Sequence, residues 1–167
     1  MTAHAGVIVV GVDHTRAARA ALEFALDEGL AHGSAVEVVT AWLWTSPFEG
    51  MNHVTSLAEG RAVAEAAQDA VIRGILDARA ARPVVSRTVV HGNAGRALVE
   101  RCEGARMLVV GSSRKGTLSR ALLGSVSAFC LRHAVAPVVV VADPGRVEHP
   151  PPGELPMVRE GDGHRRE

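Results

Sequence analysis

Three short, almost wholly apolar runs rich in β-branched residues constrain the fold of this chain more than any other feature. They are residues 6–12 (GVIVVGV), 106–110 (RMLVV) and 137–141 (PVVVV). Strands that are apolar on both faces are typical of a parallel sheet that helices cover on both sides. Residues 36–42 and 84–90 are also strand-like but admit polar side chains, as strands nearer a sheet edge do. The sequence therefore predicts five strands.

Segments with helical spacing lie between these strands. The positions that carry the spacing are Ala18, Leu22, Ala25 and Gly29, then Val63, Ala67, Ala70, Gly74 and Ala78, then Ala97, Leu98, Cys102 and Ala105, and finally Val126, Phe129, Cys130 and His133. Strand and helix alternate throughout, which indicates the α/β class. We expect an open five-stranded parallel sheet with helices on both faces, a three-layer α/β/α sandwich.

The length of the chain fits one domain and a tail. Of its 167 residues 47% are hydrophobic, which is enough for a core without disulfide or metal support. Beyond residue 142 the sequence is rich in proline and charge without apolar periodicity, so we expect a domain over 1–142 and a disordered tail over 143–167. Residues 43–60 interrupt the alternation, and they are interpreted as either a lid or interface loop or a passive surface loop.

Charge and cysteine content argue against several classes of protein. The 18 basic and 18 acidic residues give no net charge and form no long block of one sign, which argues against a nucleic-acid partner. Cys102 and Cys130 form neither a CxxC pair nor a Cys/His cluster, so we expect buried thiols and no metal site. No signal-peptide pattern and no apolar run of membrane-spanning length occurs. We therefore expect a soluble cytoplasmic protein without a membrane partner.

The candidate binding site lies in the loops after the first and fourth strands. Ligands of an open parallel sheet bind beyond the carboxyl ends of the strands, where the strand order reverses. The loop at 111–117 (GSSRKGT) runs on to Gly124 and Ser125, where the next helical period begins. A helix N-terminus binds anions, a glycine lets phosphate approach the backbone, and the Ser125 hydroxyl is a further donor. The alternative is that Ser125 serves only as the N-cap of that helix.

Two stretches of the chain resemble the universal stress protein (UspA-like) family. They are VIVVGVDHTRAARAALEFAL, from Val7, and LVVGSSRKGTLSRALLGSVSAFCLRHAVAPVVVV, which ends at Val141. The resemblance implies a five-stranded parallel sheet of order 3-2-1-4-5. It also implies the ATP-binding branch of that family, whose motif is a glycine, two residues, a glycine, nine residues and Gly-Ser or Gly-Thr. Gly111 and Gly124-Ser125 match the motif, whereas Arg114 stands at the position of the second glycine.

The same resemblance implies roles for residues outside that motif. Asp13 would contact the ribose or the adenine, and its carboxylate suits ribose hydroxyls. The alternative is that Asp13 caps the first helix, although Thr15 can provide that cap instead. Thr40 and Ala41, at the end of the second strand, would line the adenine pocket. The expected nucleotide-binding residues are thus Val12, Asp13, Thr40, Ala41, Gly111, Arg114, Gly124, Ser125 and Val126.

The expected function is that of a stress-associated regulatory module that binds ATP, with Mg²⁺ arriving only with the nucleotide. No catalytic base or metal-binding carboxylate pair accompanies the phosphate loop, so we expect that the protein is not an enzyme. A regulatory module also needs a protein partner, which the sequence does not identify. The apolar strand 137–141, an edge in the family's order, predicts a homodimer, unless the tail covers it. One alternative is a nucleotide-free dimer that acts through protein contacts. The other is a slow ATPase or phosphotransferase that uses Asp13 with His14 or Lys115.

Overall fold

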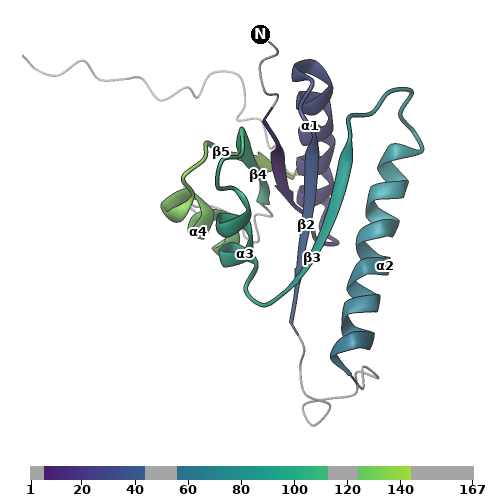
Figure 1. Ribbon diagram of the computed structural model, residues 1–167, viewed down its shortest axis with the longest axis vertical. Helices are drawn as coiled ribbons and strands as arrows, with labels where there is room; N and C mark the ends of the chain where they lie inside the picture. Colours follow the sequence, from purple (N-terminus) through teal and green to yellow (C-terminus); the bar gives the residue numbers. More distant parts are fainter. Residues whose placement is uncertain (1–5, 44–55, 113–123, 144–167) are drawn as a thin grey trace, which may run out of the picture.

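The computed structural model of the chain describes residues 6–43, 56–112 and 124–143. Within these residues a five-stranded sheet is flanked by four helices (Figure 1). The elements are β1 (Ile8–Gly11), α1 (Arg16–His32), β2 (Val36–Trp42), α2 (Leu57–Leu76), β3 (Val85–His91), α3 (Ala94–Arg101), β4 (Met107–Ser112), α4 (Ser125–His133) and β5 (Val138–Ala142). All four strand pairs are parallel and the order is β3-β2-β1-β4-β5, which confirms the predicted fold class.

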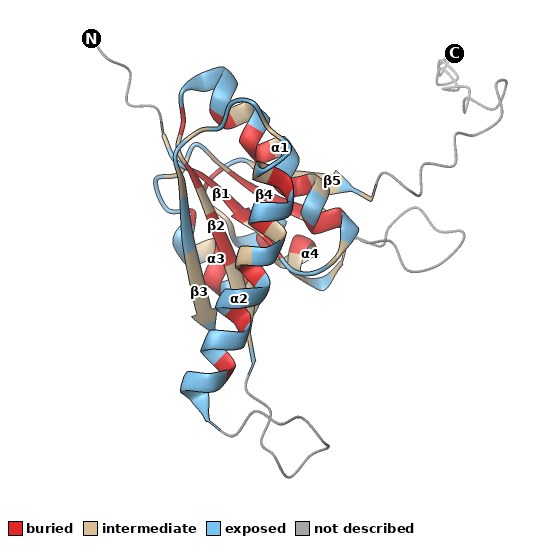
Figure 2. Cartoon of the chain, turned by 90° about the vertical axis from the view of Figure 1, so that its right-hand side faces the viewer, coloured by how far each residue is buried: buried red, intermediate tan, exposed pale blue. Residues whose placement is uncertain are grey.

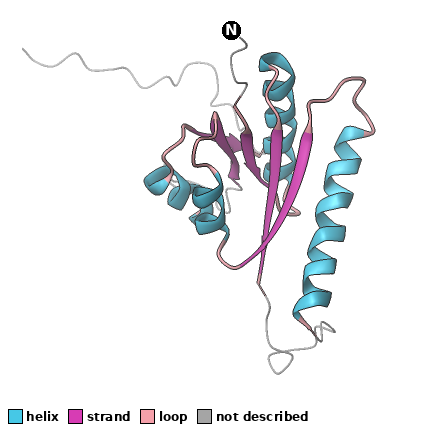
Figure 3. Ribbon diagram, viewed as in Figure 1, coloured by secondary structure: helices cyan, strands magenta, loops and turns pink. Residues whose placement is uncertain are grey.

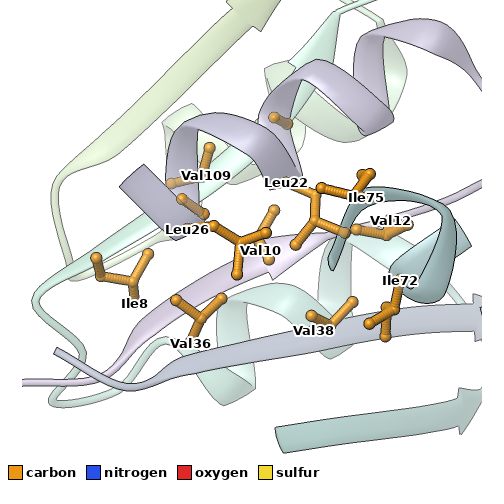
Figure 4. Close-up of a cluster of buried hydrophobic side chains, with 12 residues drawn as sticks. Ile8, Val10, Val12, Leu22, Leu26, Val36, Val38, Ile72, Ile75 and Val109 are labelled. Atoms are coloured by element: carbon orange, nitrogen blue, oxygen red, sulfur yellow. The ribbon is translucent and has the colours of Figure 1, made fainter. Parts of the chain in front are cut away.

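Helices cover both faces of the sheet because alternate residues of the central strands point to opposite sides. On one face, Ile8 and Val10 of β1 pack in a cluster with Leu22 of α1 and the α2 residue Ile72 (Figure 4). On the other face, Val9 belongs to a second cluster with residues of α3 and α4. Figure 3 shows the two helix pairs on opposite sides of the strands. The centre of the apolar run, residues 8–10, is thus buried on both faces, as its composition predicts, whereas Val7 before it is exposed.

The first helix forms as its sequence predicts. Thr15 is its N-cap, and the Thr15 hydroxyl accepts a hydrogen bond from the Ala18 amide at 3.2 Å. The helix ends at Gly33, whose φ of 63° is a left-handed conformation that favours glycine. The positions that carry the helical spacing are all buried: Ala18, Leu22, Ala25 and Gly29.

The second helix turns a different face to the sheet from the one its apolar spacing indicates. Its buried residues are Gly60, Ala64, Gln68, Ile72 and Ile75, whereas Val63, Ala67, Ala70 and Gly74 are exposed. Figure 2 shows that much of the surface of α2 is exposed. Gln68 lies in the middle of the buried face, and this polar residue hides the helical periodicity of the buried positions. The helix also begins at Leu57, inside the segment expected to be a loop. Ser56 caps it by accepting from the Glu59 amide at 3.2 Å, and a Ser-x-x-Glu pattern is a recognised helix start.

Both cysteines are free and buried, as predicted. Burial raises the pKa of the Cys130 thiol to about 11, and the neighbouring Cys102 acts in the same direction. A thiol of such high pKa is a packing residue rather than a nucleophile. No helix in the described part of the chain has the length and apolar content needed to cross a membrane.

Candidate functional site

The carboxyl ends of β1 and β4 meet the first turns of α1 and α4 around a pocket of about 250 Å³. The two strands are neighbours, but α1 packs on one face of the sheet and α4 on the other. This divergence is the geometry that opens a crevice in parallel sheets. The structure brings seven of the predicted residues into the lining: Val12, Asp13, Ala41, Gly111, Gly124, Ser125 and Val126.

The first turn of α4 forms one wall of the pocket. Gly124 is the N-cap, and the Ala128 amide donates to the Gly124 carbonyl at 2.9 Å. The amides of Ser125, Val126 and Ser127 precede that first bond, so the helix itself supplies no acceptor for them. The interpretation of Ser125 as an N-cap is therefore wrong, because Ser125 is the first helical residue. A helix N-terminus beside a pocket attracts an anion when, as among the described residues here, no acceptor is bonded to its first amides.

The two glycines that match the family motif differ in what the fold requires of them. A Cβ on Gly111 would lie 2.5 Å from the carbonyl carbon of Ala17 and 2.6 Å from the amide nitrogen of Ala18. The backbone of α1 therefore excludes any side chain at Gly111. Gly124 has an ordinary φ of −56°, and among the described residues a Cβ there would meet only the Ser127 hydroxyl, at 3.7 Å. Packing explains Gly111, whereas at Gly124 the described residues leave room for a Cβ and the glycine serves as the N-cap of α4.

Asp13 lies exposed at the rim of the pocket, directly before α1. Its Oδ1 accepts hydrogen bonds from the Thr15 amide at 2.8 Å and from the Thr15 hydroxyl at 2.6 Å. Thr15, not Asp13, caps the helix, so the capping interpretation of Asp13 is wrong. The cap falls on Thr15, the residue that the sequence offers in place of Asp13.

The end of β2 contributes only one of the two residues predicted there. Ala41 lines the pocket, whereas Thr40 is absent from the lining. The Thr40 hydroxyl instead donates to the Val12 carbonyl at 2.9 Å and accepts from Gln68 Nε2 at 3.0 Å. Consecutive residues of a strand point to opposite faces, so the two side chains cannot both face one pocket.

An apolar surface forms the remaining wall. Val39, Val110 and Gly11 come from the strands, and Ala94 and Leu98 come from α3. A Cβ on Gly11 would lie 2.8 Å from Leu98 Cδ1, so this glycine lets α3 approach β1. The lining residues that sequence reasoning did not single out are Gly11, Thr15, Ala18, Val39, Ala94, Leu98, Val110 and Ser127. The α3 residues carried no sequence signal, because the fold alone brings α3 to this crevice.

The other candidate residues lie away from the pocket or outside the described chain. Arg114 and Lys115 lie outside the described residues. His14 is exposed and does not line the pocket. His91 makes an edge contact with the Trp42 ring, with centroids 4.8 Å apart. Over 6–43, 56–112 and 124–143, no three His, Cys, Asp or Glu residues are grouped as a metal site would require.

A second, larger hollow of about 450 Å³ lies between α2 and the edge strand β3. Ion pairs compensate its charges: Arg61 with Glu65 and Arg87 with Asp69. The hydrogen bond from Arg87 lowers the pKa of Asp69 and keeps it ionised. A polar hollow whose charges are already paired attracts a ligand less than an apolar pocket with open amides. We therefore assign the candidate site to the smaller pocket.

The chain resembles known proteins over most of its length. Residues 5–142 match the model of the universal stress protein family. A universal stress protein of Mycobacterium tuberculosis is 33% identical over 164 residues, which cover 93% of this chain and 54% of that protein. A second one from the same organism is 30% identical over 173 residues, covering 93% and 53%. The chain thus spans about half the length of these curated relatives.

Solved structures share the fold. A universal stress protein in complex with cAMP is 28% identical, with a TM-score of 0.59, over 81% of this chain and 96% of that one. An Arabidopsis thaliana universal stress protein with AMP bound is 16% identical, with a TM-score of 0.54, over 82% and 91%. The described sheet, with its order β3-β2-β1-β4-β5, matches the architecture of these neighbours.

Proposed function

The chain belongs to the universal stress protein family, and from this premise we propose that it is a regulatory module that binds an adenine nucleotide, ATP, in the pocket between β1, β4, α1 and α4. One observation carries the proposal. The open first turn of α4 faces the same pocket as an apolar wall and a single rim carboxylate. These are the three chemical partners that a nucleotide needs for its phosphate, base and ribose.

In the proposed complex the phosphates lie against the amides of Ser125 and Val126. Gly124 allows them to approach the backbone, since it carries no Cβ. The base packs on the apolar surface around Val39, Ala41 and Leu98. Thr15 holds Oδ1 of Asp13, and the other carboxylate oxygen accepts from the ribose hydroxyls. Mg²⁺ arrives with ATP.

The relatives support an adenine nucleotide as the ligand class. The neighbour in complex with cAMP is similar enough in sequence, at 28% identity, to support a shared pocket. ATP is preferred here because Gly111 and Gly124-Ser125 match the spacing of the ATP-binding motif, with Arg114 as the one departure. We propose a binding module rather than an enzyme, because Asp13 is the single carboxylate in the described lining. Steady ATP turnover that Asp13→Asn abolishes would identify the alternative, a slow ATPase or phosphotransferase.

Calorimetric titration of the purified chain with ATP, AMP and cAMP tests the proposed function. We expect saturable binding, and we expect Asp13→Asn to weaken it about tenfold or more, because the variant removes a charged acceptor from the ribose. Asparagine keeps one oxygen for Thr15, so the start of α1 is preserved. His14→Ala, a change at an exposed neighbour outside the lining, is the matched control and should bind like the wild type. No binding of any of the three at millimolar concentration would favour the nucleotide-free alternative.

We further propose that the chain forms a homodimer through β5, an apolar edge strand. The Leu108 amide donates to the Pro137 carbonyl, so Val139 faces β4 and the amide of Val140 faces the open edge. Proline is tolerated at such an edge position but cannot donate to a second copy. Val140→Pro should therefore convert a dimer to a monomer in sedimentation velocity, whereas Val140→Ala should stay dimeric. A monomeric wild type would contradict this proposal. The cytoplasmic location and the protein partner stay predictions.

A further inference from the structure

Val12, the residue before Asp13, forms hydrogen bonds through both its amide and its carbonyl with two consecutive residues of β2. The Val12 amide donates to the Val39 carbonyl at 2.9 Å. The Val12 carbonyl accepts from the Thr40 hydroxyl, also at 2.9 Å. Val12 follows the last residue of β1, so these two bonds fix the chain where it leaves the sheet toward the pocket. The position of the Asp13 backbone therefore depends on Thr40.

Gln68 of α2 holds Thr40 in turn. Its side chain is 3% exposed, and its Nε2 donates to the Thr40 hydroxyl at 3.0 Å. The carbonyls of Val38 and Thr88 each lie 3.1 Å from the same nitrogen, so the three acceptors share its two protons. Thr40 needs an acceptor role toward Gln68 and a donor role toward Val12, and a hydroxyl is the group that supplies both. Valine has the same shape as threonine and supplies neither.

The side chains of Thr40 and Gln68 lie on the face of the sheet that is opposite to the apolar wall of the pocket. Val38 packs in the cluster with α1 and α2, and Thr40 is two residues further along the same strand. Val39 and Ala41, between and after them, line the pocket. The hydrogen bonds therefore connect a buried residue of α2 to the backbone of the site through the thickness of the sheet.

We propose that Thr40, held by Gln68, is a positioning residue that couples the placement of α2 to the nucleotide site through Val12 and Asp13. This inference rests on the proposed function. Thr40 touches no nucleotide; it sets the backbone from which the Asp13 carboxylate reaches the ribose. A partner that shifts α2 at its exposed face would change nucleotide affinity through this chain of hydrogen bonds. The site is thus regulated from the helix that contributes no residue to its described lining.

Titration with ATP across four proteins tests the proposal. We expect Thr40→Val to bind ATP about tenfold more weakly than the wild type. Thr40→Ser keeps the hydroxyl and should bind within about twofold of the wild type. Thr88→Val is the matched control: it removes a strand hydroxyl that donates to Glu37 at 2.8 Å and leaves the Val12 carbonyl untouched. It should also bind within about twofold, with a loss of thermal stability similar to that of Thr40→Val.

A double-mutant cycle separates positioning from general destabilisation. In the Asp13→Asn background, Thr40→Val should cause little further loss of affinity, since both changes act on one contact. A full tenfold loss in that background, or wild-type affinity in Thr40→Val itself, would overturn the inference and leave the proposed function standing. A wild type that binds none of ATP, AMP and cAMP would overturn both.

Hydrogen exchange gives a second readout that a merely structural role would not produce. ATP should slow amide exchange over residues 64–72 of α2 in the wild type, because the ligand orders the Asp13 backbone and so strengthens the bonds to Gln68. In Thr40→Val the same amides should exchange equally fast with and without ATP at saturating concentration. Equal protection of α2 in both proteins would contradict the coupling.

Discussion

Replacing Gly111 with alanine should lower the melting temperature by roughly 10 °C, although the change adds only one methyl group. That methyl would lie 2.5 Å from the carbonyl carbon of Ala17 and 2.7 Å from its oxygen. Both are backbone atoms of the first turn of α1, and no side-chain rotation relieves the contact. The helix must move away from β4, and overpacking of this kind costs about 3 kcal/mol. For a domain of this size that cost corresponds to a shift of about 6 to 12 °C.

The matched control for this prediction is Gly74→Ala. Gly74 lies in α2, and of the residues that the structure describes a Cβ there would meet only the end of the Arg19 side chain, at 3.6 Å. Alanine is the better helix former, so this variant should be as stable as the wild type or more stable by up to about 1 kcal/mol. Thermal denaturation followed by circular dichroism measures both. If Gly111→Ala has the same melting temperature as Gly74→Ala, α1 does not pack on β4 as closely as described.

The prediction for Gly111 also changes the meaning of the family motif. The spacing of Gly111 and Gly124-Ser125 treats both glycines as parts of one phosphate loop. In the structure both glycines line the pocket, but Gly111 also serves the packing of α1 on β4, whereas a Cβ at Gly124 would not clash with any described residue. Loss of nucleotide binding in a Gly111 variant would therefore report a displaced helix rather than a lost phosphate contact.

The strands could be predicted from the sequence because each apolar run is stable only as a strand that is buried in the sheet. Residues 6–12 and 106–110 carry β-branched side chains on both faces, and such runs are stable only between two helical layers. The predicted segment 36–42 coincides with β2, and the other strands differ at their ends by one or two residues. Local composition decides these elements, so long-range contacts were not needed to find them.

The orientation of α2 could not be predicted, because it depends on Gln68, whose burial is compensated by hydrogen bonds to strands that are distant in the sequence. Gln68 is buried only because three oxygens of β2 and β3 accept from its amide. The sequence shows a polar residue, followed by Asp69, and places the apolar face on Val63 and Ala67 instead. The role of Thr40 was misplaced for the same reason, since its partners lie 28 residues away on either side.

The location of the site could be predicted more fully than the set of residues that line it. The rule that ligands bind where neighbouring strands send their helices to opposite faces led directly to Asp13 and Gly124. Ala94 and Leu98 of α3 were not found, because small and apolar residues carry no chemical signature. Their place in the pocket follows from the packing of α3 against β1 and β2 and from nothing local.

Gly124→Ala should weaken ATP binding about 100-fold while leaving the stability of the protein almost unchanged. Among the described residues the new Cβ has room, with the Ser127 hydroxyl 3.7 Å away, and the backbone angles suit any residue. Alanine gains stability by restricting the unfolded chain and loses some as a poorer N-cap, and these effects nearly cancel at a few tenths of a kcal/mol. Packing against the described residues therefore does not require a glycine here.

The nucleotide, in contrast, should be sensitive to the same methyl group. Gly124 is an N-cap residue that lines the pocket, so we expect its Cβ to crowd a phosphate bound at the amides of Ser125 and Val126. Two charge-assisted hydrogen bonds would lengthen or break, which costs about 3 kcal/mol, or about 100-fold in affinity. Calorimetry of Gly124→Ala with ATP, alongside its melting curve, measures both quantities. Unchanged affinity would show that phosphate does not lie against α4, and it would remove the observation on which the nucleotide site depends.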